Sequence, residues 1–410
     1  MTSTIDSETA AGEAKTIPRI ISVDDHVVEP PHVWQTWLPE KFRAAGPRIE
    51  RRGIGHMKHI GGGAYEQTFD PAGPPADCWV FEDLVYIHKR HVAAVGYSRD
   101  EMTMTPMTYD EMRPGCYEVK ARVEDMLMNH TDASLCFPTF PRFCGQTFTE
   151  AKDRELGLAC VKAYNDWMIE EWCGESGGHL IPLCIVPLWD ADLAAEEVRR
   201  NAARGCHAVC FSEIPPHLGL PSIHSGFWDP FFQACQDTQT TVNMHIGSSS
   251  RMPATSPDAP VAVAASLSFN NSMASLTDFL FSGVLVRFPE LTLAYSEGQI
   301  GWLPYILERV DDVWREHRAW GGVADLIPEP PSTYYFRQVY GCFFRDNHGL
   351  ESLHRVGVDN ITFETDYPHT DTTWPNTLEV ATAMMGHLPE DVQYKILRGN
   401  AIKMLHLDMK

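Results

Sequence analysis

The sequence lacks the long apolar runs of a membrane protein and the paired cysteines of a disulfide framework. No run of about 18 consecutive apolar residues occurs, so we expect no membrane partner. The 11 cysteines are odd in number and scattered, without a C-x-x-C pair. Such cysteines are typical of free, buried thiols in a reducing compartment, so we expect a cytoplasmic protein.

Positive charge is also scarce. The chain has 33 Lys and Arg against 55 Asp and Glu, which gives a net charge of −22 at pH 7. Because a field of this sign repels phosphate backbones, we expect no nucleic-acid partner. A small-molecule substrate is the partner that we expect instead.

The 410 residues alternate between strand-like and helix-like segments, which is typical of a parallel sheet with crossover helices. Residues 190–205 predict the best-formed helix, with an acidic start and a terminal glycine. The alternation predicts an α/β fold, a (β/α)8 TIM barrel over residues 18–410, after a disordered lead-in at 1–17. The eight expected strands are 19–26, 132–137, 180–186, 207–212, 240–246, 291–296, 335–343 and 360–366.

Between the first two strands lies a stretch rich in glycine, proline and aromatic residues, at about residues 46–116. It is too long for an ordinary connection, and long loops in compact domains usually form lids or binding inserts. We therefore predict an irregular insertion after strand 1, on the barrel face where chemistry normally lies.

Four residues with metal-binding side chains lie where strands are predicted to end. Asp24 and His26 are two apart in the first strand and share a face, while Asp25 points away. His245 ends the fifth strand and Asp366 ends the eighth. Two carboxylates and two imidazoles suit one divalent cation, Zn²⁺ first and Mn²⁺ as the alternative. Each residue alone could be structural, but burying all four without a cation would be costly.

Short motifs occur in order along the chain, at residues 23–34, 162–167, 245–247, 287–291, 296–305, 364–369 and 399–401. In this order they resemble the amidohydrolase-related family, in the branch of the aminocarboxymuconate-semialdehyde and resorcylate decarboxylases. The resemblance implies a metal-carrying (β/α)8 barrel that is commonly a homodimer or higher homo-oligomer. It also implies Asp24, His26, His245 and Asp366 as metal ligands, with Asp24 standing where many relatives have His or Glu.

The chain departs from the decarboxylases of this group after the sixth strand, where Ser296, Glu297 and Gly298 replace a catalytic histidine. Glu297 is therefore a candidate acid–base group, or a residue that orients a ligand. His369, three residues after Asp366, is a candidate for proton transfer or substrate contact. The alternative for His369 is an outward loop histidine.

Two arginines are candidates for binding an acidic substrate. Arg142 follows the second strand and could neutralise a carboxylate, although a structural ion pair is an equal alternative. Arg309 lies in a segment similar to one whose arginine binds the substrate carboxylate or supports the subunit contact in relatives. The alternative for Arg309 is an ion pair on a helix surface.

The resemblance and these residues favour non-oxidative decarboxylation of a small aromatic or unsaturated cyclic acid, with Asp366 or Glu297 protonating the ring carbon. The alternative is metal-dependent hydrolysis of an amide, lactone or C–C bond, in which Asp366 accepts a proton from water. A barrel that only binds a ligand would be expected to have lost metal-site residues, and all four are present.

Overall fold

The structure is a computed structural model that describes residues 16–61 and 64–409. Most of the lead-in predicted at 1–17 lies outside these residues, but Ile17 is buried in the core and its carbonyl contacts the ring of His130 at 3.0 Å. Within the described ranges, every helix is too short or too polar to cross a lipid bilayer.

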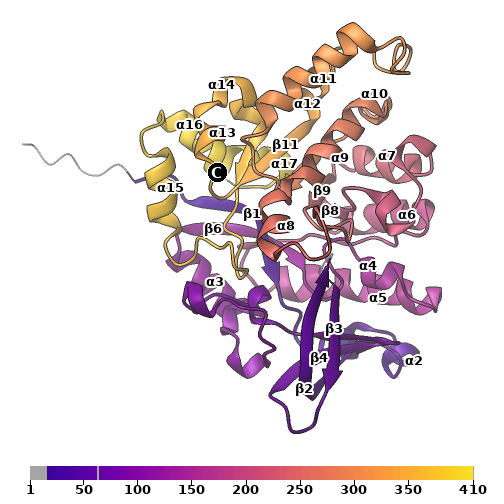
Figure 1. The fold of residues 1–410 in the computed structure, drawn as a ribbon, viewed down its shortest axis with the longest axis vertical. Coiled ribbons are helices and arrows are strands. Elements are labelled where there is room, and N and C mark those ends of the chain that lie inside the picture. The colour runs from indigo at the N-terminus through magenta and orange to yellow at the C-terminus, as the bar shows by residue number, and fades with distance from the viewer. Residues whose placement is uncertain (1–15, 62–63, 410) are drawn as a thin grey trace, which may run out of the picture.

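Eight parallel strands of the described chain form two sheets (Figure 1). One sheet has the order β1-β6-β7 and the other has the order β12-β11-β10-β9-β8. Their side chains are almost all buried, as expected for strands covered by helices. The strands are β1 (Ile20–Val27), β6 (Thr131–Pro138), β7 (Leu180–Ile181), β8 (Ala208–Phe211), β9 (Thr241–His245), β10 (Leu293–Ser296), β11 (Val339–Phe343) and β12 (Ile361–Phe363).

Backbone hydrogen bonds join the two sheets at both ends. The N–H of Cys184, just after β7, donates to Ala208 of β8 at 3.1 Å. On the other side, the N–H of Asp366 donates to Asp24 at 3.0 Å, and the N–H of His26 donates to Tyr367 at 2.6 Å. These bonds bring the carboxyl ends of β1 and β12 together.

Asp25 strengthens the same seam from the side of β1 opposite to Asp24. Its carboxylate accepts hydrogen bonds from the hydroxyls of Ser22 and Ser134, from the Thr365 hydroxyl and from the Tyr367 N–H. The expectation that Asp25 points away from its neighbours in sequence is therefore met. Asp25 ties β1 to β6 and to the segment after β12.

Helices connect the strands and cover the sheets. The predicted helix at 190–205 is present as α6, and the carboxylate of Asp190 caps it by accepting from Asp192 and Leu193. Hydrophobic residues of the strands and of these helices form one large core. The longer helices are α3 (Val119–Met128), α5 (Arg154–Trp167), α6 (Ala191–Ala202), α7 (Asp229–Asp237), α9 (Phe269–Phe281), α11 (Leu303–His317), α12 (Pro331–Gln338) and α15 (Thr377–Met385).

The segment between β1 and β6, predicted to be irregular, instead contains a regular antiparallel sheet of order β3-β2-β4-β5. Its strands β2 and β3 project below the rest of the molecule in Figure 1. Four 3-10 turns follow between residues 90 and 116. The sheet consists of β2 (Arg48–Gly61), β3 (Ala64–Phe69), β4 (Pro75–Phe81) and β5 (Leu84–Ile87).

Three predicted strands differ from those observed. The third is only two residues long, followed by an isolated bridge at Cys184. The first four residues of the predicted seventh strand belong to α12, and β11 begins at Val339. The eighth ends at Phe363, so Asp366 lies three residues beyond the strand, with a positive φ of 50° that no strand residue adopts.

Candidate active site

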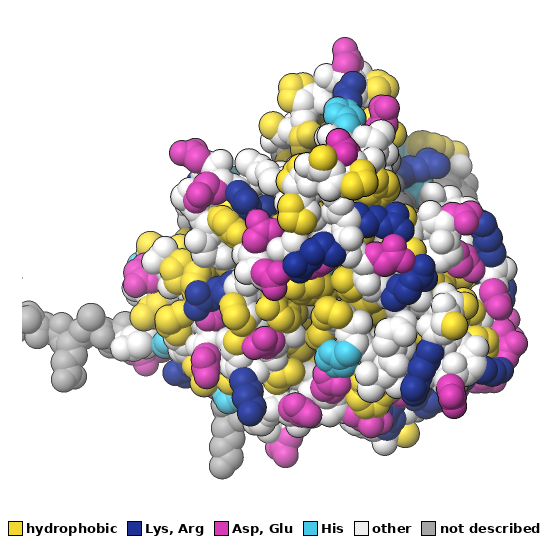
Figure 2. Space-filling view, turned by 90° about the horizontal axis from the view of Figure 1, so that it is seen from below, with side chains coloured by type: hydrophobic (Ala, Val, Ile, Leu, Met, Phe, Trp, Pro, Cys, Tyr) yellow, Lys and Arg dark blue, Asp and Glu magenta, His cyan; other side chains and the backbone are white. Residues whose placement is uncertain are grey.

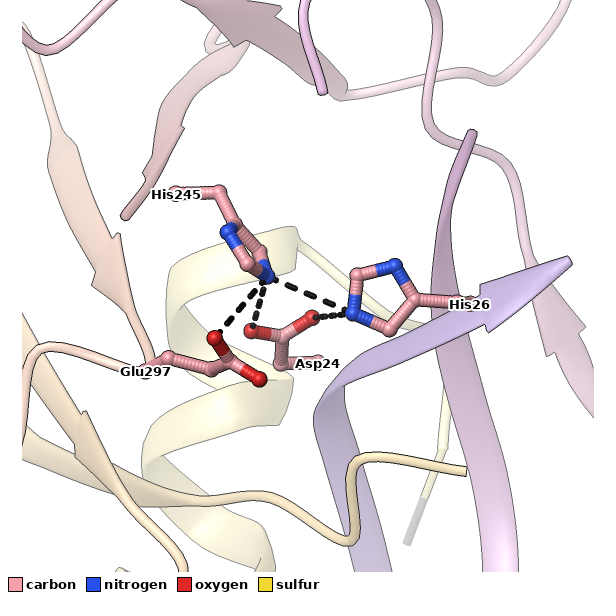
Figure 3. Close-up of side chains that lie close together, drawn as sticks. All are labelled: Asp24, His26, His245 and Glu297. Atoms are coloured by element: carbon pink, nitrogen blue, oxygen red, sulfur yellow. Dashed lines mark hydrogen bonds and ion pairs between the residues drawn. The ribbon is translucent and has the colours of Figure 1, made fainter. Parts of the chain in front are cut away.

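Four buried side chains converge on one point at the carboxyl ends of the strands (Figure 3). Asp24 and His26 come from β1, His245 ends β9, and Glu297 follows β10. The Nε2 of His245 lies 3.3 Å from Nε2 of His26, 3.3 Å from Oδ2 of Asp24 and 3.6 Å from Oε2 of Glu297. One donor atom from each lies within 4.8 Å of the others, which is close enough for a shared cation.

Asp366 belongs to a second, overlapping set with His26, Glu297 and His369. Its Oδ1 lies 3.3 Å from Nε2 of His26 and 3.5 Å from Nδ1 of His369. The structure thus brings together three of the four residues expected as ligands, Asp24, His26 and His245. It places Asp366 beside His26, while Glu297 occupies the fourth position of the first set.

The donor atoms fit a cation because they have no other means of neutralisation. Both carboxylate oxygens of Asp24 and of Asp366 are buried without a hydrogen-bond partner among the described residues. Burial, and then repulsion from neighbouring carboxylates, raises the pKa of Asp24 and of Asp366 well above the usual range. A divalent cation would relieve both the desolvation and the repulsion.

The two histidines of the first set present neutral nitrogens to this point. Nδ1 of His245 lies 2.6 Å from the carbonyl of Ile246, so Nδ1 carries the proton and the Nε2 lone pair faces the cluster. Burial lowers the pKa of His245 to about 3 and the pKa of His26 well below its usual value. Neutral imidazole is the form that binds metals.

Aromatic stacking fixes the same rings. The Phe143 ring stacks on His245 with centroids 4.1 Å apart, and His369 stacks on His26 at 3.5 Å. His369 therefore faces the site rather than solvent, which argues against its alternative as an outward loop histidine. Its side chain is 15% exposed.

Glu297 and Asp366 both adopt the left-handed backbone conformation, with φ of 52° and 50°. This conformation is uncommon for residues other than glycine and is concentrated at functional sites. Burial and the carboxylate of Glu364 raise the pKa of Glu297 well above its usual range. The protein environment therefore favours the neutral form of the Glu297 carboxyl group.

A cavity of about 330 Å³ opens onto this cluster. Glu297 and His369 form part of its lining, and the segment between β1 and β6 supplies another part. Much of the remaining lining is apolar, which suits a small molecule with a ring. The apolar lining includes Val92, Pro138, Phe143, Ile246 and Met252.

The two arginines differ in their relation to this cavity. Arg142 lines it, and its guanidinium pairs with Glu150 and contacts the Ser250 hydroxyl at 3.4 Å. Arg309 is exposed on α11 and is not among the residues that line this cavity, and its proposed role in substrate binding stays a prediction. The alternatives of a subunit contact or an ion pair on the helix surface stay predictions.

Sequence reasoning missed two residues at the site. Glu364 accepts a hydrogen bond from the N–H of Glu297 at 3.1 Å, and burial raises its pKa to about 7. It lies two residues before Asp366, and this spacing was the available signal. Lys89, which lines the cavity, had no such signal because no pattern tied it to a strand end.

The amidohydrolase family profile matches residues 33–407. The chain belongs to the amidohydrolase family. It is thus an enzyme of the amidohydrolase superfamily, as the resemblance predicted. A search of curated proteins finds no match.

Solved amidohydrolases share the fold over nearly the whole chain. An amidohydrolase from Mycobacterium avium subsp. paratuberculosis K-10 has 22% identity and a TM-score of 0.66, covering 95% of this chain and 99% of its own. The structure of 5-carboxyvanillate decarboxylase from Novosphingobium aromaticivorans DSM 12444 is complexed with manganese and 4-hydroxy-3-methoxy-5-nitrobenzoic acid. It has 14% identity and a TM-score of 0.62, and the match covers 95% of this chain and 96% of its own. The structure of 2,6-dihydroxybenzoate decarboxylase from Rhizobium has 15% identity and a TM-score of 0.59, and the match covers 96% of this chain and 100% of its own. These relatives imply a TIM barrel.

Proposed function

We propose that this amidohydrolase is a metal-dependent, non-oxidative decarboxylase of a small aromatic or unsaturated cyclic acid, built on one (β/α)8 barrel. The observation that carries the proposal is the buried cluster of imidazoles and unpartnered carboxylates, of which Glu297 and His369 line a largely apolar cavity. The decarboxylases among the structural relatives support the same reaction class.

One divalent cation, Zn²⁺ or Mn²⁺, would be held by Asp24, His26, His245 and Asp366. When bound, it would hold the substrate carboxylate or an adjacent hydroxyl and stabilise developing negative charge. The manganese in 5-carboxyvanillate decarboxylase supports Mn²⁺ as strongly as the donor set supports Zn²⁺. Elemental analysis of the purified protein decides between them.

Glu297 is the residue proposed to protonate the ring carbon, because it lines the cavity and Asp366 does not. Protonation breaks the ring's aromatic or conjugated system at the carbon that bears the carboxylate. The C–C bond then breaks, carbon dioxide leaves, and the electron pair of that bond restores the ring. Glu297 regains its proton from water, and no redox cofactor is needed.

A product analysis tests this reaction against hydrolysis. Aromatic acids, including 2,6-dihydroxybenzoate and 5-carboxyvanillate, and small amides and lactones are incubated with the metal-loaded protein in ¹⁸O-labelled water. Release of carbon dioxide without ¹⁸O in the organic product supports the decarboxylase. Incorporation of ¹⁸O into that product would instead establish the hydrolase.

The ligand assignment is tested separately from activity. We expect Asp366→Asn and His245→Ala to lose both turnover and bound metal, because each removes one donor from a buried site. Metal content is measured by elemental analysis after gel filtration, with the exposed-site variant Glu290→Gln as a control. Stoichiometric metal in both variants would refute the assignment.

A further inference from the structure

Lys89 is a buried cation in the wall of the cavity. It follows β5 and pairs with Pro106 across an isolated bridge, which fixes its backbone. Its side chain lines the same cavity as Glu297 and His369, and the residue is only 7% exposed. It is not part of either set of metal-capable residues.

The ammonium group of Lys89 has no carboxylate partner among the described residues. Its Nζ donates one hydrogen bond, to the carbonyl of Ile87 at 3.2 Å. It also lies 4.8 Å from the ring centroid of Tyr65 and 4.5 Å from that of Tyr86. An ammonium can donate three hydrogen bonds, and burying it without a counter-charge is costly.

The other cation of the cavity is already engaged. Arg142 pairs with Glu150, and its side chain is 32% exposed. Burial lowers the pKa of Lys89 to about 8, so the group still carries its charge at neutral pH. The chain has a net charge of −22, and yet this buried cation at the cavity has no carboxylate beside it in the described part of the chain. An anionic ligand that enters the cavity would supply the missing counter-charge.

We propose that Lys89 binds a second acidic group of the substrate, so that the enzyme acts on ring acids with two anionic groups. This inference rests on the proposed function, which places the first carboxylate at the metal centre. The cavity of about 330 Å³ has room for a single ring, and Phe143 and Ile246 contribute to its apolar lining. A charged hydrogen bond to Lys89 in this desolvated wall then selects the diacid.

Calorimetric titration of the manganese-loaded protein tests the inference without requiring turnover. The probes are benzoate and the three benzenedicarboxylates. We expect at least one dicarboxylate to bind wild type about tenfold more tightly than benzoate, since a charge-assisted hydrogen bond is added. In Lys89→Met, this preference should fall to within about twofold while benzoate affinity is unchanged.

Matched variants separate this effect from misfolding. Lys89→Arg keeps the charge and should retain most of the preference. Lys58→Met removes an exposed lysine on β2 and should change nothing. The inference is overturned if wild type prefers none of the dicarboxylates, or if Lys89→Met keeps the preference. Failure of the proposed reaction would appear separately, as absence of carbon dioxide release with the binding preference intact.

Discussion

At the scale of single residues, β1 shows how one strand serves two purposes. Asp24 and His26 face the metal-capable cluster, and Asp25 between them bonds to β6 and to the segment after β12. Strand alternation made this division predictable from sequence. The place of Arg309 was not predictable, because the direction of a helix side chain depends on how the helix packs.

Glu297 is predicted to act as the general acid and not as a metal ligand. Glu297→Gln should lower kcat by about 10²- to 10⁴-fold, as expected on removal of a general acid, while metal content stays at the wild-type level. Steady-state kinetics on any acid that wild type decarboxylates, with elemental analysis of the same preparation, measures both quantities. Loss of the metal together with activity would make Glu297 a ligand instead.

At the scale of elements, the strands with long buried apolar runs were predictable and the ends of elements were less so. β1, β6, β8, β9 and β10 lie within one or two residues of their expected places. The start of β11 was misplaced because residues 335–338 resemble a strand in sequence but form the end of α12, where Tyr335 is buried and Phe336 is exposed. The regularity of the sheet before β6 was missed because its glycines and prolines suggested a loop.

The loop after β9 depends on one buried carboxylate, Glu213. Its Oε1 accepts hydrogen bonds from the N–H of Gly247, the hydroxyl of Ser249 and the amide of Asn271, while Oε2 has no partner among the described residues. Burial raises its pKa from 4.5 to about 7. Glu213 thus positions the loop that forms part of the cavity wall.

This carboxylate predicts a pH dependence of stability. Because the pKa of Glu213 is higher in the folded protein than in the unfolded chain, its protonated carboxyl group stabilises the folded state. This contribution is fully present below pH 4.5 and is lost as the pH rises through about 7. Glu213→Gln keeps the accepting oxygen but does not titrate, so the unfolding free energy of wild type should fall by about 3 kcal/mol relative to the variant between about pH 5 and pH 8. Urea denaturation at each pH measures this difference.

The control is Glu196→Gln, which changes an exposed glutamate on α6. It should track wild type at every pH. If the unfolding free energies of wild type and Glu213→Gln differ by the same amount at every pH, the raised pKa of Glu213 is contradicted.

At the scale of the whole molecule, the net charge of −22 is spread rather than gathered on the face seen in Figure 2. Acidic and basic side chains are interspersed there, with hydrophobic side chains between them. The 11 cysteines are all free and buried, as predicted. A separate group of buried carboxyl groups lies inside, formed by Asp24, Glu297, Glu364 and Asp366.

Because these buried carboxyl groups repel one another, we expect a bound divalent cation to stabilise the folded protein. A ligand at about 100 times its Kd contributes about 2.7 kcal/mol, so adding Mn²⁺ or Zn²⁺ to chelator-treated protein should raise the Tm by about 3 °C or more. Scanning calorimetry measures the shift. The His245→Ala variant should show no shift at the same metal concentration, and an equal shift in both proteins would place the cation elsewhere.

Residues from different stretches of the chain line the cavity and the cluster beside it. Lys89 and Tyr86 come from the antiparallel sheet and the turn after it, whereas the metal-capable residues come from the ends of the parallel strands. Recombination that exchanges only the former stretch with that of a homologue would alter which small molecules the cavity admits and leave the metal-capable residues in place. Selectivity and reactivity in this enzyme can therefore diverge on separate evolutionary paths.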